Sequence, residues 1–425
     1  MGPIEASESP HAGTVDGSGG SFRRNRVLLL LTAVYLLNYL DRQVLVILAE
    51  PIKREFALQD WQIGFLAGPA FALFYATLGI PVARMADRAN RVDIIAVSLA
   101  TWSAMTMLCA SATSFVQLAL ARTGVGIGEA GGSPPAVSLL ASYFPPARLS
   151  TAMSVYSSGA TLGILAGFVI AGWVNAEHGW RVAMIVAGAP GIALAILVKL
   201  AVKDPRVPRE LPADTDSSRS VAASFRTLMA SSRCRWINAA AVWAAVAVYG
   251  FMGWMPAYLM RSFDVSTREV GTALGLIAGI AGSAGVFAGG WFADRAAASS
   301  ARRQFLVPAV TTAMFPVVAI LALQARDWTT ALVWLAPAYA LCLAYTGPTW
   351  AALQTAVPQH MRAMAAALLL FLVNLVGLGL GPQLVGVASD LFADAGVDGL
   401  RSAIGGICCF SVVAAACFLR CARSG

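Results

Sequence analysis

The chain has 425 residues, of which 58% are hydrophobic and only 12% are charged, and its mean hydropathy is +0.70. A soluble domain usually carries about a quarter charged residues and under half apolar ones. The composition therefore disfavours a soluble enzyme, a disordered chain and a disulfide scaffold, and it predicts a bundle of membrane-spanning helices. The formal net charge is +8, but the Lys and Arg residues lie between the apolar stretches, as topology signals do. The charge therefore does not indicate nucleic-acid binding.

The predicted elements follow a tail over residues 1–22, which is rich in Gly, Ser and Pro and is expected to be disordered in the cytoplasm. A bilayer core needs about 20 apolar residues per helix. Twelve stretches meet this requirement: 26–51, 60–84, 91–111, 115–141, 148–174, 180–200, 235–262, 267–293, 303–325, 328–355, 361–389 and 400–420. The charged, Pro- and Ser-rich segment 203–234 is a predicted cytoplasmic linker between an N-terminal half at 23–202 and a C-terminal half at 235–421, which a tail at 422–425 follows.

The basic residues predict the orientation of the chain. If the N-terminus is cytoplasmic, 21 of the 30 Lys and Arg residues lie in cytoplasmic loops and tails, and seven lie on the opposite side. Such an excess in short loops indicates the cytoplasmic side. Both termini are therefore predicted to be cytoplasmic, and the compact loops favour a bacterial inner membrane.

Cysteine and histidine give no sign of a metal centre. The seven cysteines have no regular spacing, and the three histidines lie in tails or loops. No Ser/His/Asp cluster lies within the spans, and no phosphate-binding GxxxxGK[ST] segment is present. No cofactor and no enzymatic activity are expected. The lack of a phosphate-binding segment disfavours an ATP-driven pump, so a proton gradient is the predicted driving force.

The two halves repeat one another. Five residues of the first half recur 207 positions later, and five others recur 214 positions later. The first set is Gly64, Gly68, Ala86, Asp87 and Arg88; the second is Arg148, Ala152, Gly163, Gly167 and Gly172. Such a repeat predicts two six-helix halves that rock around a central site.

Two loops carry a family resemblance. GIPVARMADRANR after the second span and GGWFADR after the eighth resemble the cytoplasmic loop motif of the major facilitator superfamily. NYLDR in span 1 and RTGVGIGEAGGSPP in span 4 are similar to its Spinster branch, whose members move lysophospholipids and sphingoid phosphates. The resemblance implies an all-α membrane fold of twelve helices in two pseudo-symmetric halves, acting as a monomer. Anion symporters of the superfamily carry similar signatures in the same spans.

The loop motif predicts a cytoplasmic gate. An Asp-Arg pair stands at two repeat-equivalent span ends, and such a carboxylate can bind the positive N-terminus of a neighbouring helix. The predicted gate residues are Asp87, Arg88, Arg91, Asp294 and Arg295.

Only four ionisable residues lie well inside spans: Asp41, Arg42, Arg122 and Glu129. A charge at the bilayer centre costs roughly 2.5–3.5 kcal/mol, so opposite charges of spans 1 and 4 are expected to meet. Burial favours the neutral form of a carboxyl group and a nearby arginine favours the charged form. Asp41 and Glu129 are therefore predicted proton acceptors, and the two arginines are their partners or anchors for a substrate headgroup. A permanent structural ion-pair network is the alternative.

The cavity wall is predicted to differ between the halves. Span 1 offers polar residues beside its charges, whereas the spans of the second half have no charged residue in their interiors. This asymmetry would suit an amphipathic substrate, with its charged head on the first half and its tail on the second. The cavity candidates are Tyr35, Asn38, Tyr345, Trp350, Gln354 and Asn374.

Several glycines predict close helix contacts. Glycines leave span 4 with little bulk, and in span 5 they recur every four residues on one face, with counterparts in span 11. Those of spans 5 and 11 are expected at the interface between the halves. The set is Gly124, Gly126, Gly128, Gly159, Gly163, Gly167, Gly377 and Gly381.

The leading prediction is a proton-coupled secondary transporter of an amphipathic, lysophospholipid-like or sphingoid-like substrate, working by alternating access. The second keeps this mechanism for small organic anions or drugs. The third is a membrane receptor or scaffold that uses the fold without transport.

Overall fold

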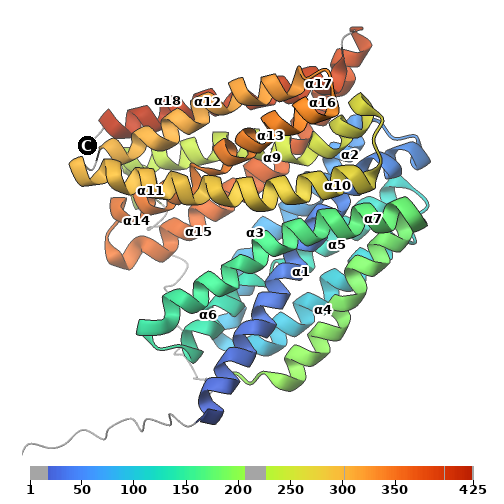
Figure 1. Ribbon diagram of the computed structural model, residues 1–425. Coiled ribbons are helices and arrows are strands. Elements are labelled where there is room, and N and C mark those ends of the chain that lie inside the picture. Colours follow the sequence, from blue (N-terminus) through green and yellow to red (C-terminus); the bar gives the residue numbers. More distant parts are fainter. Residues whose placement is uncertain (1–17, 206–225, 301, 397, 424–425) are drawn as a thin grey trace, which may run out of the picture.

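A computed structural model describes residues 18–205, 226–300, 302–396 and 398–423 (Figure 1). Within these ranges every regular element is a helix. Most of the predicted tail at 1–22 and of the predicted linker at 203–234 lies outside them. Helix α1 begins at Ser18, before the predicted end of the tail, because extending an existing helix adds one hydrogen bond per residue.

The N-terminal half is built from helices that alternate in direction across the bundle. Its helices are α1 (Ser18–Phe56), α2 (Asp60–Ala67), α3 (Pro69–Arg88), α4 (Arg91–Cys109), α5 (Phe115–Glu129), α6 (Ser133–Tyr143) and α7 (Pro146–Ala201).

The C-terminal half has the same plan, with a π-helical segment inside two of its spans. Its elements are α9 (Ser232–Phe263), α10 (Thr267–Leu276), η1 (Ile277–Gly282, π-helical), α11 (Ser283–Ser299), η2 (Arg303–Phe305), α12 (Leu306–Leu323), α13 (Trp328–Leu343), α14 (Thr346–Ala356), η3 (Gln359–Met361), α15 (Arg362–Leu372), η4 (Val373–Leu378, π-helical), α16 (Gly379–Asp394), α17 (Gly399–Cys408) and α18 (Phe410–Arg423).

The helices account for twelve crossings. Ten continuous helical stretches of the described chain are long and apolar enough to span a bilayer. One of them, 148–201, contains two crossings, because Gly179 interrupts α7 with a φ of 81°, a backbone conformation that favours glycine. The twelfth crossing is the shorter pair α5 and α6, which a turn separates.

The two halves meet at one end of the molecule and diverge toward the other (Figure 1). We name these the closed end and the open end. At the closed end α2 lies against α16 and α7 lies against α10. The start of α1 and the end of α18 lie at the open end.

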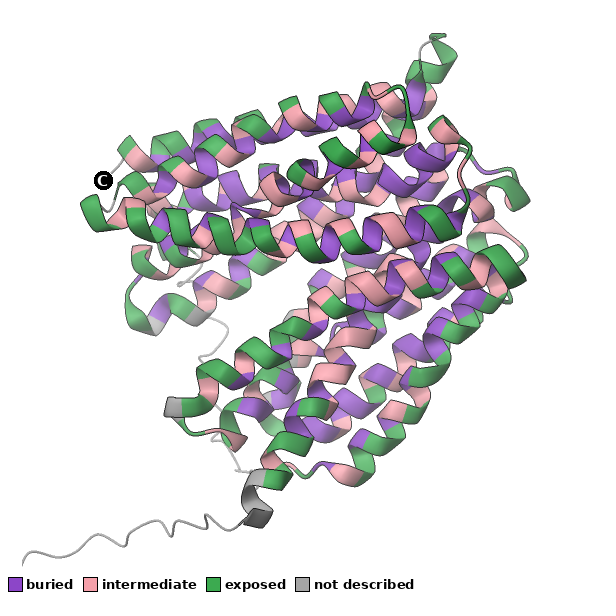
Figure 2. Cartoon of the chain, viewed as in Figure 1, coloured by how far each residue is buried: buried purple, intermediate pink, exposed green. Residues whose placement is uncertain are grey.

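The outer faces of both halves are apolar. Figure 2 shows buried residues inside each group of helices and exposed residues along the outside. Large hydrophobic side chains such as Leu200 (77% exposed) and Phe287 (78% exposed) lie on these faces. A contiguous apolar exterior of this kind requires a lipid environment, so the protein is an integral membrane protein.

Two close backbone crossings join the halves, and they are related by the internal repeat. A Cβ on Gly172 of α7 would lie 2.4 Å from the carbonyl oxygen of Thr267, at the start of α10. The repeat-equivalent pair is Gly386 of α16 and Asp60 at the start of α2, where the same distance would be 2.5 Å. Only glycine permits so close an approach at either place.

The glycines of spans 5 and 11 are not at this interface, contrary to the prediction. Gly159, Gly163 and Gly167 of α7 face backbone carbonyl groups of α1, in their own half. Gly377 and Gly381 face α9, also in their own half. The four-residue spacing identified a shared helix face, but spacing does not identify the helix that this face meets.

Candidate functional site: paired charges beside the central cavity

Glu129 lies at a break in a membrane-spanning helix. It is the last residue of α5, and Gly131 and Gly132 then form a turn through hydrogen bonds from their amides to the carbonyl groups of Gly128 and Glu129. The next helix, α6, has proline in its first turn, where the missing amide proton is not needed. The break places a carboxylate in the interior of the N-terminal half.

Arg42 of α1 binds this carboxylate. Its Nε and Nη2 atoms both lie 2.8 Å from Oε2 of Glu129. The Glu129 side chain is fully buried, whereas that of Arg42 retains 15% of its exposure. The pair therefore has one inaccessible partner and one partner that remains accessible.

Asp41, the neighbour of Arg42, pairs with Arg122 of α5. Its Oδ2 lies 3.6 Å from Nη1 of Arg122, and its Oδ1 accepts a hydrogen bond of 2.5 Å from Thr106 of α4. Asp41 and Arg122 are each 3% exposed. The structure thus brings the four predicted charges together as two opposite-charge pairs between α1 and α5.

Neither pair uses all of its polar atoms. Asp41 Oδ2, Arg122 Nε and Glu129 Oε1 are buried and find no hydrogen-bond partner in the described chain. An unsatisfied buried polar atom is costly, so each of these three atoms offers a position for a further hydrogen-bond partner within the site.

Aromatic rings surround the accessible arginine. The guanidinium carbon of Arg42 lies 4.6 Å from the ring centre of Tyr75, 5.0 Å from that of Phe71 and 5.4 Å from that of Tyr39. Cation–π attraction of this kind is strongest where water is excluded. The sequence reasoning missed these rings and Thr106, because an aromatic or threonine in an apolar span has no distinctive pattern.

The span 4 glycines let this site assemble. A Cβ on Gly126 would lie 2.5 Å from the carbonyl oxygen of Phe71, and one on Gly128 would lie 2.6 Å from the amide nitrogen of Trp102. Gly124 lies against Met105 in the same way. Helices α3 and α4 therefore approach α5 closely around the buried charges.

A cavity of about 350 Å³ lies between the halves beside these charges. Arg42, Arg122 and Tyr39 line it from the N-terminal half. The residues that line it from the C-terminal half are mainly apolar or aromatic, and they include Tyr249, Met252, Tyr345, Trp350 and Leu369.

Two of the six predicted cavity residues, Tyr345 and Trp350, line this cavity. The other four belong to different surroundings. Tyr35 stacks on Tyr156 with ring centres 4.4 Å apart, and Asn38 is buried at 4% exposure. Gln354 accepts a hydrogen bond from Arg362 through its backbone carbonyl, and the Asn374 side chain donates to the carbonyl of Leu370.

The predicted gate residues have different surroundings in this conformation. Arg91 is buried within the N-terminal half, where it binds Asp204 through Nη2 at 2.5 Å and Nε at 3.0 Å. Arg88 is exposed at the end of α3, and the side chain of Asp87 lies outside the described part of the chain. Asp294 and Arg295 are exposed in α11, where Arg295 stacks on Trp291.

The sequence profile of the Major Facilitator Superfamily matches residues 31–420. The chain belongs to the Major Facilitator Superfamily. It is a membrane transporter and not an enzyme.

Individual superfamily members are also similar to this transporter. It is 36% identical over 365 residues to an MFS-type efflux pump of Mycolicibacterium smegmatis, a match that covers 86% of this chain and 84% of the pump. A hexuronate transporter of Bacillus subtilis is 26% identical over 405 residues and is covered to 94%. The crystal structure of a bacterial homologue of the human lysosomal transporter Spinster, inward-facing and unoccupied, superposes with a TM-score of 0.84 at 30% identity, over 95% of this chain and 97% of that one.

Proposed function

We propose that this superfamily member is a proton-coupled transporter of an amphipathic substrate that carries an anionic headgroup. Lys and Arg residues are in excess on the side of the membrane where the two termini lie. We therefore assign the termini to the cytoplasm and the protein to a bacterial inner membrane. The open end then faces the cytoplasm. A single chain forms the whole cavity, so the functional unit is a monomer.

The observation that carries the proposal is the position of Arg42 between Glu129 and the cavity. One edge of its guanidinium group, formed by Nε and Nη2, binds the buried carboxylate, and the group also lines the space that a substrate would enter. An anionic substrate and Glu129 therefore compete for the same cation.

This competition couples protons to transport. Protonation of Glu129 removes its charge and frees Arg42 to bind a substrate phosphate or carboxylate. Loss of the proton re-forms the ion pair and displaces the substrate. Asp41 and Arg122 form a second pair of the same kind one position along α1, and the unsatisfied atoms of both pairs favour this exchange of partners.

The wall on the C-terminal half supports an amphipathic substrate. It places Met252, Trp350 and Leu369 opposite the arginines, so a headgroup on one side and a hydrocarbon tail on the other would each find a matching surface. The likeness to a Spinster homologue supports the Spinster resemblance of the sequence, which implies a lipid-like substrate. The relatedness to a hexuronate transporter favours the second candidate, a small organic anion held by the same arginines.

Uptake into proteoliposomes tests the proposal. Labelled lysophospholipid and labelled hexuronate would be compared, each with and without an imposed pH gradient. Asp41→Asn and Glu129→Gln would be measured beside Asp93→Asn, which removes an exposed carboxylate paired with Lys199 and serves as the matched control.

Gradient-driven uptake of lysophospholipid is expected in the wild type and in Asp93→Asn, and its loss is expected in both site variants. Gradient-driven uptake of hexuronate alone would replace the lipid by the small anion. Uptake that ignores the gradient and both site variants would contradict proton coupling. Movement of neither solute by a folded protein would exclude both of these substrates and direct the search to other organic anions and to drugs.

A further inference from the structure

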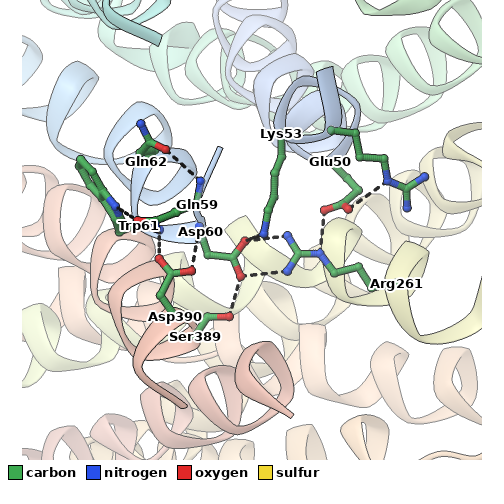
Figure 3. Close-up of polar contacts among 10 residues, drawn as sticks. Glu50, Lys53, Gln59, Asp60, Trp61, Gln62, Arg261, Ser389 and Asp390 are labelled. Atoms are coloured by element: carbon green, nitrogen blue, oxygen red, sulfur yellow. Dashed lines mark hydrogen bonds and ion pairs between the residues drawn. The ribbon is translucent and has the colours of Figure 1, made fainter. Parts of the chain in front are cut away.

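The closed end holds a cluster of six charged side chains from both halves (Figure 3). The N-terminal half contributes Glu50, Lys53 and Arg54 from α1 and Asp60 from α2. The C-terminal half contributes Arg261 from α9 and Asp390 from α16. The three carboxylates balance the three cations.

Arg261 is the one residue of this cluster that joins two buried carboxylates across the interface. Its Nε donates to Glu50 at 2.7 Å, and its Nη1 and Nη2 donate to the two oxygens of Asp60 at 2.9 and 2.8 Å. Glu50 is 6% exposed and Asp60 is 3% exposed, whereas the Arg261 side chain keeps 25%. Three charge-assisted hydrogen bonds from one planar group make a strong and directional contact.

The C-terminal half also holds the first turn of α2. Asp390 accepts hydrogen bonds from the backbone amides of Asp60 at 3.0 Å and Trp61 at 2.8 Å. Ser389 donates to Asp60 at 2.6 Å. A carboxylate at a helix N-terminus satisfies amides that the helix itself leaves unpaired and complements the positive end of the helix dipole.

Each buried carboxylate has a second cation within its own half. Glu50 accepts a hydrogen bond from Arg54 at 3.2 Å, and Asp60 accepts one from Lys53 at 2.5 Å. If Arg261 withdrew, neither carboxylate would be left without a partner, and Arg261 would enter water at the end of the bundle. The contact can therefore break without the large penalty of an uncompensated buried charge.

The repeat-equivalent crossing lacks this chemistry. Thr267 stands in place of Asp60, and Asn175 stands in place of Ser389 and donates to the Thr267 hydroxyl at 2.9 Å. The ion pair between Arg268 and Glu177 at this crossing is 3.6 Å long and largely exposed, so screening weakens it. The two crossings share their backbone geometry, but the α2–α16 crossing has ion pairs to buried carboxylates and the α7–α10 crossing has an exposed ion pair.

We propose that Arg261 is a releasable clasp, that is, a contact that holds the closed end shut and can break, and that the α2–α16 crossing, more than the α7–α10 crossing with its exposed ion pair, sets how often the closed end opens. Lys53 and Arg54 take over the carboxylates when the clasp is released. The clasp requires alternating access but neither a proton nor a particular substrate, so it stands or falls independently of the proposed coupling.

A distance measurement between spin labels tests this proposal. One label would be placed in each half at the closed end, through Ser111→Cys and Ala395→Cys, both at exposed positions. The background would carry Cys409→Ser, since the other six cysteines of the chain are buried. Pulsed electron paramagnetic resonance then reports the ratio of long to short distances in purified protein.

Arg261→Gln and Asp60→Asn are each expected to raise the ratio of long to short distances about tenfold or more. The matched control, Thr267→Val, removes the two hydrogen bonds that the Thr267 hydroxyl makes with Gly172 and Asn175 at the α7–α10 crossing, and it is expected to raise the ratio less than either charge substitution does. Arg261→Lys keeps the charge but loses the fork of donors, so an intermediate ratio is expected.

Asp60→Asn is nearly isosteric, so it can be measured even if Arg261→Gln does not fold. An unchanged ratio of long to short distances in Asp60→Asn would overturn the clasp. So would an equal rise in Thr267→Val, because both crossings would then contribute alike. Size-exclusion profiles of the variants must match the wild type for either comparison.

Discussion

Arg42 and Glu129 are 87 residues apart in the chain, yet two nitrogen atoms of the arginine converge on a single oxygen of the glutamate. The other carboxylate oxygen, Oε1, is buried and has no hydrogen-bond partner among the described residues. Half of the carboxylate is therefore bound and half is unsatisfied. Oε1 is therefore the oxygen of this carboxylate that Arg42 leaves available to a proton.

Arg42→Lys is expected to reduce the initial rate of transport about tenfold, which corresponds to about 1.4 kcal/mol. Lysine keeps the positive charge, but its single nitrogen cannot make both contacts to Oε2. It also lacks the planar guanidinium group that lies over the ring of Tyr75. Proteoliposome uptake measures the effect. Arg181→Lys, at a half-exposed pair with Glu55, is the control, and an equal loss there would refute a specific role for Arg42.

Trp350→Ala is expected to weaken the preference for longer hydrocarbon tails. Each buried CH₂ group contributes about 0.8 kcal/mol, and Trp350 provides part of the apolar wall of the cavity. Competition by lysophospholipids of increasing chain length measures that preference. Trp334→Ala, on an exposed face of α13, should leave the slope unchanged. If competition depended on chain length equally in the wild type, Trp350→Ala and Trp334→Ala, the hydrocarbon tail of the substrate would not contact Trp350.

Arg91→Gln is expected to destabilise the N-terminal half by about 3–5 kcal/mol, because Asp204 would lose its bidentate partner in a buried position. The apparent melting temperature in detergent is the measurement. Arg88→Gln changes an exposed residue at the end of α3 and should leave that temperature nearly unchanged. A normal melting temperature together with defective transport in Arg91→Gln would instead favour a gating role.

Gly163→Ala is expected to cost about 1–3 kcal/mol of stability by overpacking the contact between α7 and α1. The added Cβ would lie 2.3 Å from the carbonyl oxygen of Leu36, a backbone atom that cannot yield easily. Gly79→Ala is the control, since a Cβ there meets nothing within 4 Å. Thermal unfolding distinguishes the two; equal stability would mean that α1 and α7 can separate without penalty.

The sequence predicted the buried site better than the contacts between the halves. Arg122 and Glu129 are seven residues apart, so helical geometry alone places them on one face of span 4. The cost of a lone charge in a bilayer then required partners, and span 1 held the other two ionisable residues. Fold class followed from composition and from the repeat.

The clasp escaped prediction for a physical reason. Charges near span ends commonly anchor a helix in the interfacial region, and Glu50, Asp60 and Arg261 all fit that role. Their meeting depends on how the two halves dock, which the periodicity of a single span does not encode. The repeat did mark Gly172 and Gly386 as equivalent positions. A repeat does not, however, identify the helix that each of these glycines contacts.

As long as the closed end stays shut, the backbone contacts at Gly172 and Gly386 act as a fulcrum for small tilts of the two halves. Helix α9 has 32 residues and is about 48 Å long, so a tilt of about 10° around that fulcrum would move its far extremity by about 8 Å. In this conformation small tilts are therefore amplified along the length of the helices. The addition of one methyl group at Gly172 or Gly386 would change the width of the open end by far more than the size of that methyl group.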